Sequence, residues 1–180
     1  MPGPIRFSQL LDEFTEGRMP GLKSDGTRTS YENSFKALRP FFVEKHGDPF
    51  VREIGRRRVV KFLEWRRTFR VGDESGTAGV SLHTVRRDRR VLSLLFSYAY
   101  KLEYIDANPC YKIDADKPDA REVRLLKPGE LGDFLSAADK NPMLRMLIVL
   151  LAESGLRLYT EAFQLRWADV DFVSGRLNVV

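Results

Sequence analysis

The sequence contains one cysteine, Cys110, among its 180 residues. A lone thiol cannot form a disulfide within the chain, and it excludes a zinc site built from several cysteines. Long apolar runs are also missing, because the longest, residues 146–152, is far shorter than the roughly 20 residues that cross a bilayer as a helix. The first residues contain no apolar stretch typical of a secretory signal peptide. These absences predict a cytoplasmic protein with no membrane partner.

The net charge of +5 is modest, but it is unevenly distributed. Residues 51–90 contain 12 Lys and Arg against 5 Asp and Glu, so this segment carries +7 and the remaining residues carry −2. A concentrated basic excess is typical of a nucleic-acid-binding surface, although basic runs more often form a solvated helix face. Arginine predominates in the segment, which favours phosphate contact, because the planar guanidinium can bind two oxygens at once.

Helical periodicity and capping patterns predict a helical first domain, residues 1–110. Helices are expected over residues 5–17, from residue 29 to about 39, over 54–70 and over 81–102. Thr29 and Glu32 form a capping-box pattern at the start of the second helix, and Pro40 is expected to kink or end it. Ser81 is the expected N-cap of the fourth helix, and Asn108 and Pro109 end the domain.

The expected helix over 81–102 has an acid-free stripe opposite its apolar face. The stripe consists of His83, Arg86, Arg87, Arg90, Ser93, Ser97 and Lys101. Because a solvated face more often mixes charges of both signs, the stripe favours contact with DNA over simple solvation. The candidate DNA-binding residues of the domain are Arg28, Thr29, Lys36, Arg57, Lys61, His83, Arg86, Arg87 and Arg90.

A second domain is expected over residues 126–180, after a linker at 111–125 that has many charges of both signs and no apolar period. Pro128 suits a first helical position, and Leu131, Phe134 and Leu135 suit the buried face of that helix. An apolar helix over 143–152 follows. Gly155 is expected to end that helix in a left-handed conformation, and a turn at 174–175 precedes a strand start at 176–180.

Arg157 follows the apolar helix, and another helix is expected to begin directly after Gly155. Arg157 would then lie at a tight helix–helix junction, behind a segment too apolar to be exposed. A guanidinium in such a place requires a partner, and Glu161 lies one helical turn away. Two interpretations remain open from these residues, a structural ion pair and a functional site.

Residues 153–171 resemble the first catalytic block of the tyrosine recombinases, the phage-integrase family. The family pattern is Gly-Leu-Arg, then an acid, then Leu-x-Trp-x-Asp-Val-Asp. The matching residues are Gly155, Leu156, Arg157, Glu161, Leu165, Trp167, Asp169, Val170 and Asp171. The acid usually comes three residues after the arginine, and here it comes four after, so one extra residue lies between Arg157 and Glu161. Both spacings keep the two residues on one helical face.

The resemblance implies a mainly α fold. It implies a four-helix core-binding (SAM-like) bundle at 1–110, which clamps one side of a DNA duplex. The first helices and first strand of a mixed α/β catalytic domain would follow. Members of the family cleave and rejoin DNA through a 3′-phosphotyrosine, without a metal or other cofactor. Arg157 would stabilise charge on the phosphate and Glu161 would orient Arg157. The implied partners are double-stranded DNA and further copies of the protein on DNA.

The same resemblance implies that the family's tyrosine nucleophile, its catalytic lysine and its His-x-x-Arg pair would follow residue 180. The chain is therefore expected to be the N-terminal part of a recombinase, inactive by itself. Tyr159 is in the wrong place to be the nucleophile, and His46 and His83 do not match the catalytic histidine. Two alternatives remain, a stand-alone DNA-binding module from a truncated integrase gene and a helical interaction protein without a nucleic-acid role.

Overall fold

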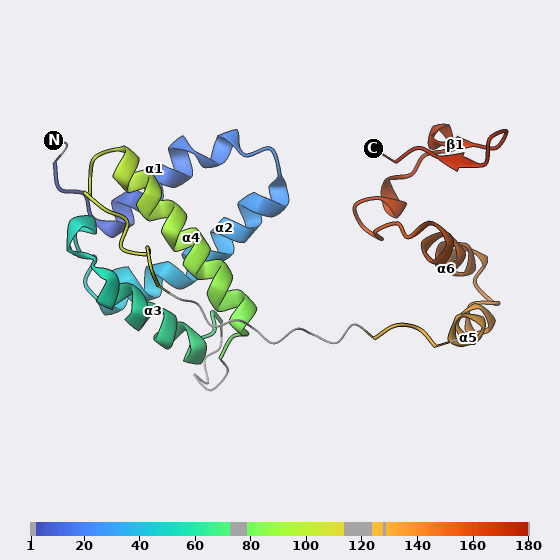
Figure 1. The fold of residues 1–180 in the computed structure, drawn as a ribbon, viewed down its shortest axis with the longest axis horizontal. Coiled ribbons are helices and arrows are strands. Elements are labelled where there is room, and N and C mark those ends of the chain that lie inside the picture. The colour runs from blue at the N-terminus through green and yellow to red at the C-terminus, as the bar shows by residue number, and fades with distance from the viewer. Residues whose placement is uncertain (1–2, 73–78, 114–123, 128, 180) are drawn as a thin grey trace. The chain divides into compact units, whose positions relative to one another are not determined.

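The computed structural model describes residues 3–72, 79–113, 124–127 and 129–179. The chain divides into two compact units, unit 1 (residues 1–120) and unit 2 (residues 121–180). Within the described ranges the chain is mainly helical (Figure 1), which confirms the expected mainly α class. These ranges also contain one two-stranded antiparallel sheet. None of the described helices is both long and apolar enough to span a bilayer. Pro128 and most of the expected linker lie outside the described residues.

Unit 1 is organised around its longest helix, α4, which α1, α2 and α3 all contact (Figure 1). The elements are α1 (Phe7–Gly17), η1 (Met19–Gly21), α2 (Asp25–Arg39), η2 (Pro40–Lys45), η3 (Val51–Glu53), α3 (Arg56–Thr68) and α4 (Leu82–Lys101). The expected helices over 5–17, 54–70 and 81–102 are confirmed to within two residues at each end. Ser81 is the N-cap of α4, where its hydroxyl accepts a hydrogen bond from the backbone N–H of Thr84 at 3.3 Å.

The expected start of the second helix at Thr29 is wrong, because α2 begins at Asp25. Ser24 has the extended backbone of an N-cap residue, and Asp25 places a carboxylate in the first turn, where it is favoured by the helix dipole. The helix therefore starts four residues before Thr29, and the Ser24 side chain makes no capping hydrogen bond in the structure. Thr29 consequently lies inside α2, on one exposed face with Asn33 and Lys36.

Pro40 ends α2 at Arg39, as expected, but the chain continues as a π-helical turn, η2. Proline has no N–H to donate and its ring crowds the preceding turn, so the α-helical hydrogen-bond ladder cannot continue through it. The wider turn places Phe41 and Phe42 in the core, where both rings pack against Phe62 at centroid distances of 5.4 and 5.6 Å.

The core of unit 1 is dominated by phenylalanine. Its largest buried side chains are Phe7, Phe14, Phe41, Phe42, Phe62 and Phe96. Cys110 and Ile113 also pack against this core, and burial raises the pKa of the Cys110 thiol to about 12. The chain therefore remains packed on unit 1 as far as residue 113.

Unit 2 consists of short elements. They are α5 (Glu130–Ala137), α6 (Pro142–Ser154), η4 (Ala162–Gln164), η5 (Trp167–Asp169), β1 (Val170–Asp171) and β2 (Arg176–Leu177). Gly155 closes α6 at φ 67°, in the expected left-handed conformation. The side chain of Arg145 joins α5 to α6, because it donates to the carbonyl oxygen of Leu135 and to Asp139. The expected turn at 174–175 connects β1 to β2, and in the register of the two strands Asp171 lies opposite Arg176.

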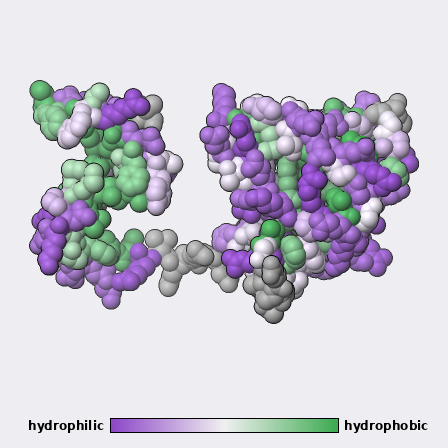
Figure 2. Space-filling model, turned by 180° about the vertical axis from the view of Figure 1, so that it is seen from behind, coloured by the Kyte–Doolittle hydropathy of each residue, from purple (hydrophilic) through white to green (hydrophobic). Residues whose placement is uncertain are grey.

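The expected burial of apolar side chains in unit 2 is wrong. No described residue of α5 or α6 is buried, and Met143 and Met146 are 76% and 60% exposed. Phe134, expected on a buried face, is also exposed. Among the described residues of unit 2, α5 and the short turn η4 pack against α6, and two such short elements do not cover an apolar helix on all sides. Figure 2 shows apolar surface gathered on this unit.

Candidate functional site

Helices α2, α3 and α4 border a hollow of about 610 Å³ in unit 1, here named the basic pocket. Its lining residues are Asn33, Lys36, Arg66, Arg70, Val71, Gly79, Val80, Ser81, Thr84 and Arg87. Four of these side chains are basic, and no described residue in the lining is acidic. A concave surface lined by cations concentrates its electric field, and such a lining is suited to anions such as phosphates.

Each helix contributes to the basic pocket through a different part of its length. The exposed face of α2 supplies Asn33 and Lys36, and the end of α3 supplies Arg66. Gly79 brings the chain back beside α3 before α4 begins. A Cβ at Gly79 would collide with the backbone carbonyl of Arg67, so this close approach requires glycine.

A buried polar network lies beside the basic pocket, centred on Asp88 of α4. One carboxylate oxygen of Asp88 accepts a hydrogen bond from Nε of Arg66 at 2.7 Å, and the other accepts from the hydroxyl of Ser34 at 2.7 Å. The Arg66 and Asp88 side chains are 4% and 0% exposed. Arg87 also contacts Asp88 at 3.4 Å through two of its nitrogens. The network therefore joins α2, α3 and α4 through polar contacts.

The structure brings only two of the predicted DNA-binding residues, Lys36 and Arg87, into the basic pocket. The others predicted on α4, namely His83, Arg86 and Arg90, keep surface exposure but do not line it. Arg57 and Lys61 are exposed near the start of α3, away from the pocket-lining end of that helix.

Arg28 and Thr29, also predicted to bind DNA, lie in α2 outside the pocket lining. Arg28 lies 3.9 Å from Asp25, and its Nε has no hydrogen-bond partner among the described residues. Thr29 is exposed.

The acid-free stripe expected on α4 is not a continuous open surface. The side-chain amide of Asn108 donates to the hydroxyl of Ser97 at 2.9 Å and to the backbone carbonyl of Ser93 at 2.8 Å. The segment after α4 therefore folds back over this end of the stripe. Ser93 and Ser97 are thereby partly covered, whereas His83, Arg90 and Lys101 are exposed.

Sequence reasoning missed the pocket residues Asn33, Arg66, Arg70, Ser81 and Thr84 as ligand contacts. One pattern could have indicated Arg66. Asp88 lies three residues after Val85 and four before Leu92, on the apolar face of α4, where a carboxylate needs a buried cation as partner. The identity of that cation still required the tertiary structure.

Arg157 and Glu161 form the expected ion pair in unit 2. The guanidinium Nη1 of Arg157 lies 2.7 Å from Oε1 of Glu161, and the backbone N–H of Arg157 donates to Oε2 at 2.8 Å. These two hydrogen bonds, the backbone one first, lower the pKa of Glu161. The expected burial of Arg157 at a helix–helix junction is wrong, because its side chain is 80% exposed. The guanidinium is held by Glu161 and open to a ligand on its other side.

The helix expected directly after Gly155 is replaced by a wide turn. The backbone N–H of Ala162 donates to the carbonyl of Arg157 at 2.9 Å, and that of Phe163 donates to Leu158 at 3.0 Å. Such bonds across five residues are typical of a π-turn, which holds one residue more than an α-helical turn. The carbonyl of Arg157 also accepts from the backbone N–H of Glu161 at 3.0 Å, and the two side chains meet within this turn.

Two acids of the matched motif have local structural contacts. Asp169 accepts a hydrogen bond from the backbone N–H of Arg166 at 2.8 Å, at the start of η5. Asp171 accepts from the backbone N–H groups of Val173 and Ser174 and from the Ser174 hydroxyl, and these hydrogen bonds, those of Ser174 first, lower its pKa. These two carboxylates therefore hold the turn and the hairpin that follow Glu161.

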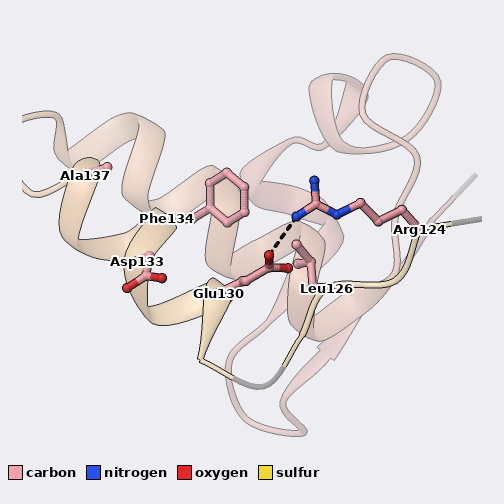
Figure 3. Close-up of a pocket in the computed structure, with 6 residues that line it drawn as sticks. All are labelled: Arg124, Leu126, Glu130, Asp133, Phe134 and Ala137. Atoms are coloured by element: carbon pink, nitrogen blue, oxygen red, sulfur yellow. Dashed lines mark hydrogen bonds and ion pairs between the residues drawn. The ribbon is translucent and has the colours of Figure 1, made fainter.

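A second hollow, of about 430 Å³, lies beside α5 in unit 2 (Figure 3). Arg124 and Glu130 pair across it at 2.7 Å, and Glu130 also accepts the backbone N–H of Lys127. Asp133 is the second acid in the lining, and Leu126, Phe134 and Ala137 supply the apolar surface of the hollow.

Comparison with solved structures identifies the fold. The chain superposes on a lambda integrase dimer bound to a COC′ core site with a TM-score of 0.73 and 19% identity, over 99% of this chain and 49% of that one. It matches a lambda integrase tetramer bound to a Holliday junction with a TM-score of 0.72 and 21% identity, over 93% and 46% of the two chains. For the Tn1549 transposon integrase in complex with circular intermediate DNA, the TM-score is 0.68 and the identity 21%, over 93% and 52%.

The chain therefore has the fold of the corresponding part of these integrases, and it spans about half the length of each of the three chains. No protein-family model matches the sequence, and no curated protein matches it.

Proposed function

We propose that this chain is the DNA-binding N-terminal portion of a site-specific tyrosine recombinase. The observation that carries the proposal is the basic pocket, with four cations and no described acid in its lining, in a chain with the integrase fold. The lambda and Tn1549 integrases with this fold are bound to DNA in their solved structures. Residues 1–110 would form the four-helix core-binding domain, 111–125 the linker and 126–180 the start of the catalytic domain.

Binding by unit 1 would occur mainly through backbone phosphates. Arginine supplies most of the cations around the pocket and along α4, and its planar fork matches the oxygens of a phosphate. Phosphate contacts of this kind position a protein on duplex DNA independently of the base sequence. Copies of the recombinase would associate with one another on the DNA.

Unit 2 would contribute Arg157 to the reaction. In strand cleavage, negative charge accumulates on one phosphate, and a fixed guanidinium beside that phosphate lowers the energy of the transition state. The carboxylate of Glu161 accepts hydrogen bonds from the guanidinium and from the backbone N–H of Arg157. The charged hydrogen bond orients the guanidinium, whose other side is exposed. This arrangement suits an arginine that binds a phosphate from solvent.

The test is the salt dependence of binding to short duplex DNA. Replacing Arg86, Arg87 and Arg90 together by alanine should weaken binding to all sequences. It should also reduce the slope of log affinity against log salt concentration by roughly one for each phosphate that the variant no longer neutralises.

A matched control removes the same charge elsewhere in unit 1, from the exposed residues Arg18, Lys23 and Lys45. This variant should keep a slope much closer to that of the wild type. Equal slopes for the two triple variants, or no binding by the wild-type chain at low salt, would contradict the proposal and favour an interaction protein without a nucleic-acid role.

A further inference from the structure

Asp88 contacts two of the arginines that line the basic pocket, Arg66 and Arg87. Its Oδ2 accepts from Nε of Arg66, while its Oδ1 accepts from the Ser34 hydroxyl and lies 3.4 Å from Nε and Nη2 of Arg87. One buried carboxylate thus holds an arginine from α3, an arginine from its own helix and a hydroxyl from α2. Both arginines line the basic pocket.

Each of the two guanidiniums keeps a terminal nitrogen that these contacts do not use. Arg66 uses Nε for Asp88 and Nη1 for the carbonyl oxygen of Phe69, and Arg87 uses Nε and Nη2 for Asp88. Within the described residues, Nη2 of Arg66 and Nη1 of Arg87 make no hydrogen bond. Because a guanidinium is rigid and planar, fixing one edge also fixes the direction of the remaining donors.

We infer that Asp88 is a positioning residue for a phosphate site in the basic pocket. It holds Arg66 and Arg87 so that their remaining N–H donors, together with the ammonium group of Lys36, bind one backbone phosphate of duplex DNA. Donors held in place before the ligand arrives lose less conformational freedom on binding. The inference rests on the proposed DNA-binding function and adds the pocket that takes the phosphate and the residue that orients its ligands.

The direction in which Asp88→Asn changes DNA affinity distinguishes a positioning role of Asp88 from an effect of its charge alone. Asp88→Asn keeps the size of the side chain and removes a negative charge near the DNA. If Asp88 acted only through its charge, this change would tighten DNA binding. Positioning predicts weaker binding, because Arg66 and Arg87 are then without the carboxylate that directs them.

A double-mutant cycle on the full chain tests the coupling, with short fluorescein-labelled duplex DNA as the probe. In the wild type, Arg87→Ala should remove one phosphate contact and lower the salt slope by about 0.9, so the fall in affinity between 50 and 200 mM salt becomes about 3.5-fold smaller. In the Asp88→Asn background, the same Arg87→Ala change should leave the slope nearly unchanged. Lys23→Ala, which removes an exposed charge outside the pocket, should act equally in both backgrounds.

The outcomes are distinguishable. An equal effect of Arg87→Ala in both backgrounds, or tighter binding by Asp88→Asn, overturns the inference and leaves the proposed function intact. Absence of DNA binding by the wild-type chain overturns the proposed function itself. If circular dichroism shows that Asp88→Asn does not fold, the apolar pair Arg66→Met with Asp88→Leu provides the second background, because replacing both members of a buried ion pair preserves stability. Arg87→Ala must again have no effect on the slope there.

Discussion

The buried pair of Arg66 and Asp88 leads to a prediction about the stability of unit 1. Arg66→Met leaves Asp88 buried and charged, with the Ser34 hydroxyl and the longer contact to Arg87 as its remaining partners. Asp88→Leu leaves the guanidinium of Arg66 with the carbonyl oxygen of Phe69 as its acceptor. Removing one member of a buried ion pair costs about 3–5 kcal/mol of unfolding free energy. Arg66→Met should lie near the lower end of that range and Asp88→Leu near the upper end.

The double variant should be far more stable than the sum of the single changes. With both charges replaced by apolar side chains, the Ser34 hydroxyl has the carbonyl oxygen of Ser30, 3.2 Å away, as its acceptor in place of Asp88. Arg87, whose side chain is 38% exposed, reaches water. No uncompensated charge is then left inside, so the double variant should lie within about 1–2 kcal/mol of the wild type. The two substitutions should therefore be coupled by several kcal/mol.

Urea unfolding followed by tryptophan fluorescence measures these differences. Trp65 of α3 packs against Phe69 at a ring distance of 4.1 Å and so reports on unit 1. Trp167 of unit 2 is exposed and should be changed to Phe in every variant, so that one reporter remains. Single variants within about 1 kcal/mol of the wild type, or a double variant as unstable as the two singles added together, would refute the reasoning about buried charge.

Two further predictions concern the ion pair of unit 2. In a recombinase that contains this chain, Arg157→Ala should slow DNA cleavage by roughly 100- to 1,000-fold and leave DNA binding nearly unchanged, because binding is spread over many phosphates and the transition state concentrates charge on one. Glu161→Gln should slow cleavage less than Arg157→Ala does. Full cleavage activity per folded Arg157→Ala molecule would rule out the catalytic role. For the isolated chain, NMR titration should show the pKa of Glu161 rising in Arg157→Ala only part of the way to its ordinary value, because the backbone N–H donor remains. Because the pKa of Glu161 is lowered in the folded chain, its contribution to stability is present above the unfolded-state pKa of about 4.3 and is lost as the pH falls through the folded-state pKa. An unchanged Glu161 pKa in Arg157→Ala would show that the side-chain contact does not act in solution.

The bounds of most helices follow from residues close together in the sequence. Ser81 fixes the start of α4 through a hydrogen bond three residues away, Pro40 ends α2 by lacking an N–H, and Gly155 ends α6 because it can adopt a left-handed conformation. The predicted start of α2 is wrong because the helix begins at Asp25, after Ser24, whose side chain makes no capping hydrogen bond. The capping-box pattern of Thr29 and Glu32 marks a favourable helix start, but it does not exclude a further helical turn before it.

The motif around Arg157 was also readable from the sequence, but its surroundings were not. The contact between Arg157 and Glu161 needs only their four-residue separation, and it is present. The exposure of Arg157 depends on how many elements unit 2 packs around α6, which periodicity does not report. The catalytic role of the two residues remains a prediction, as does DNA binding by Arg28, Thr29, Lys36, Arg57, Lys61, His83, Arg86, Arg87 and Arg90.

The sequence by itself determined that this chain is mainly helical, that basic residues concentrate in 51–90, and that Arg157 and Glu161 meet, because each depends on composition or on neighbours within a few residues. Only the tertiary structure decided which cations gather at one place. Lys36, Arg66 and Arg87 come from three helices, and they line one pocket because α2 and α3 both pack on α4. Arg66 is turned inward for the same reason, since a carboxylate 22 residues away becomes its buried partner only when α3 and α4 are packed together.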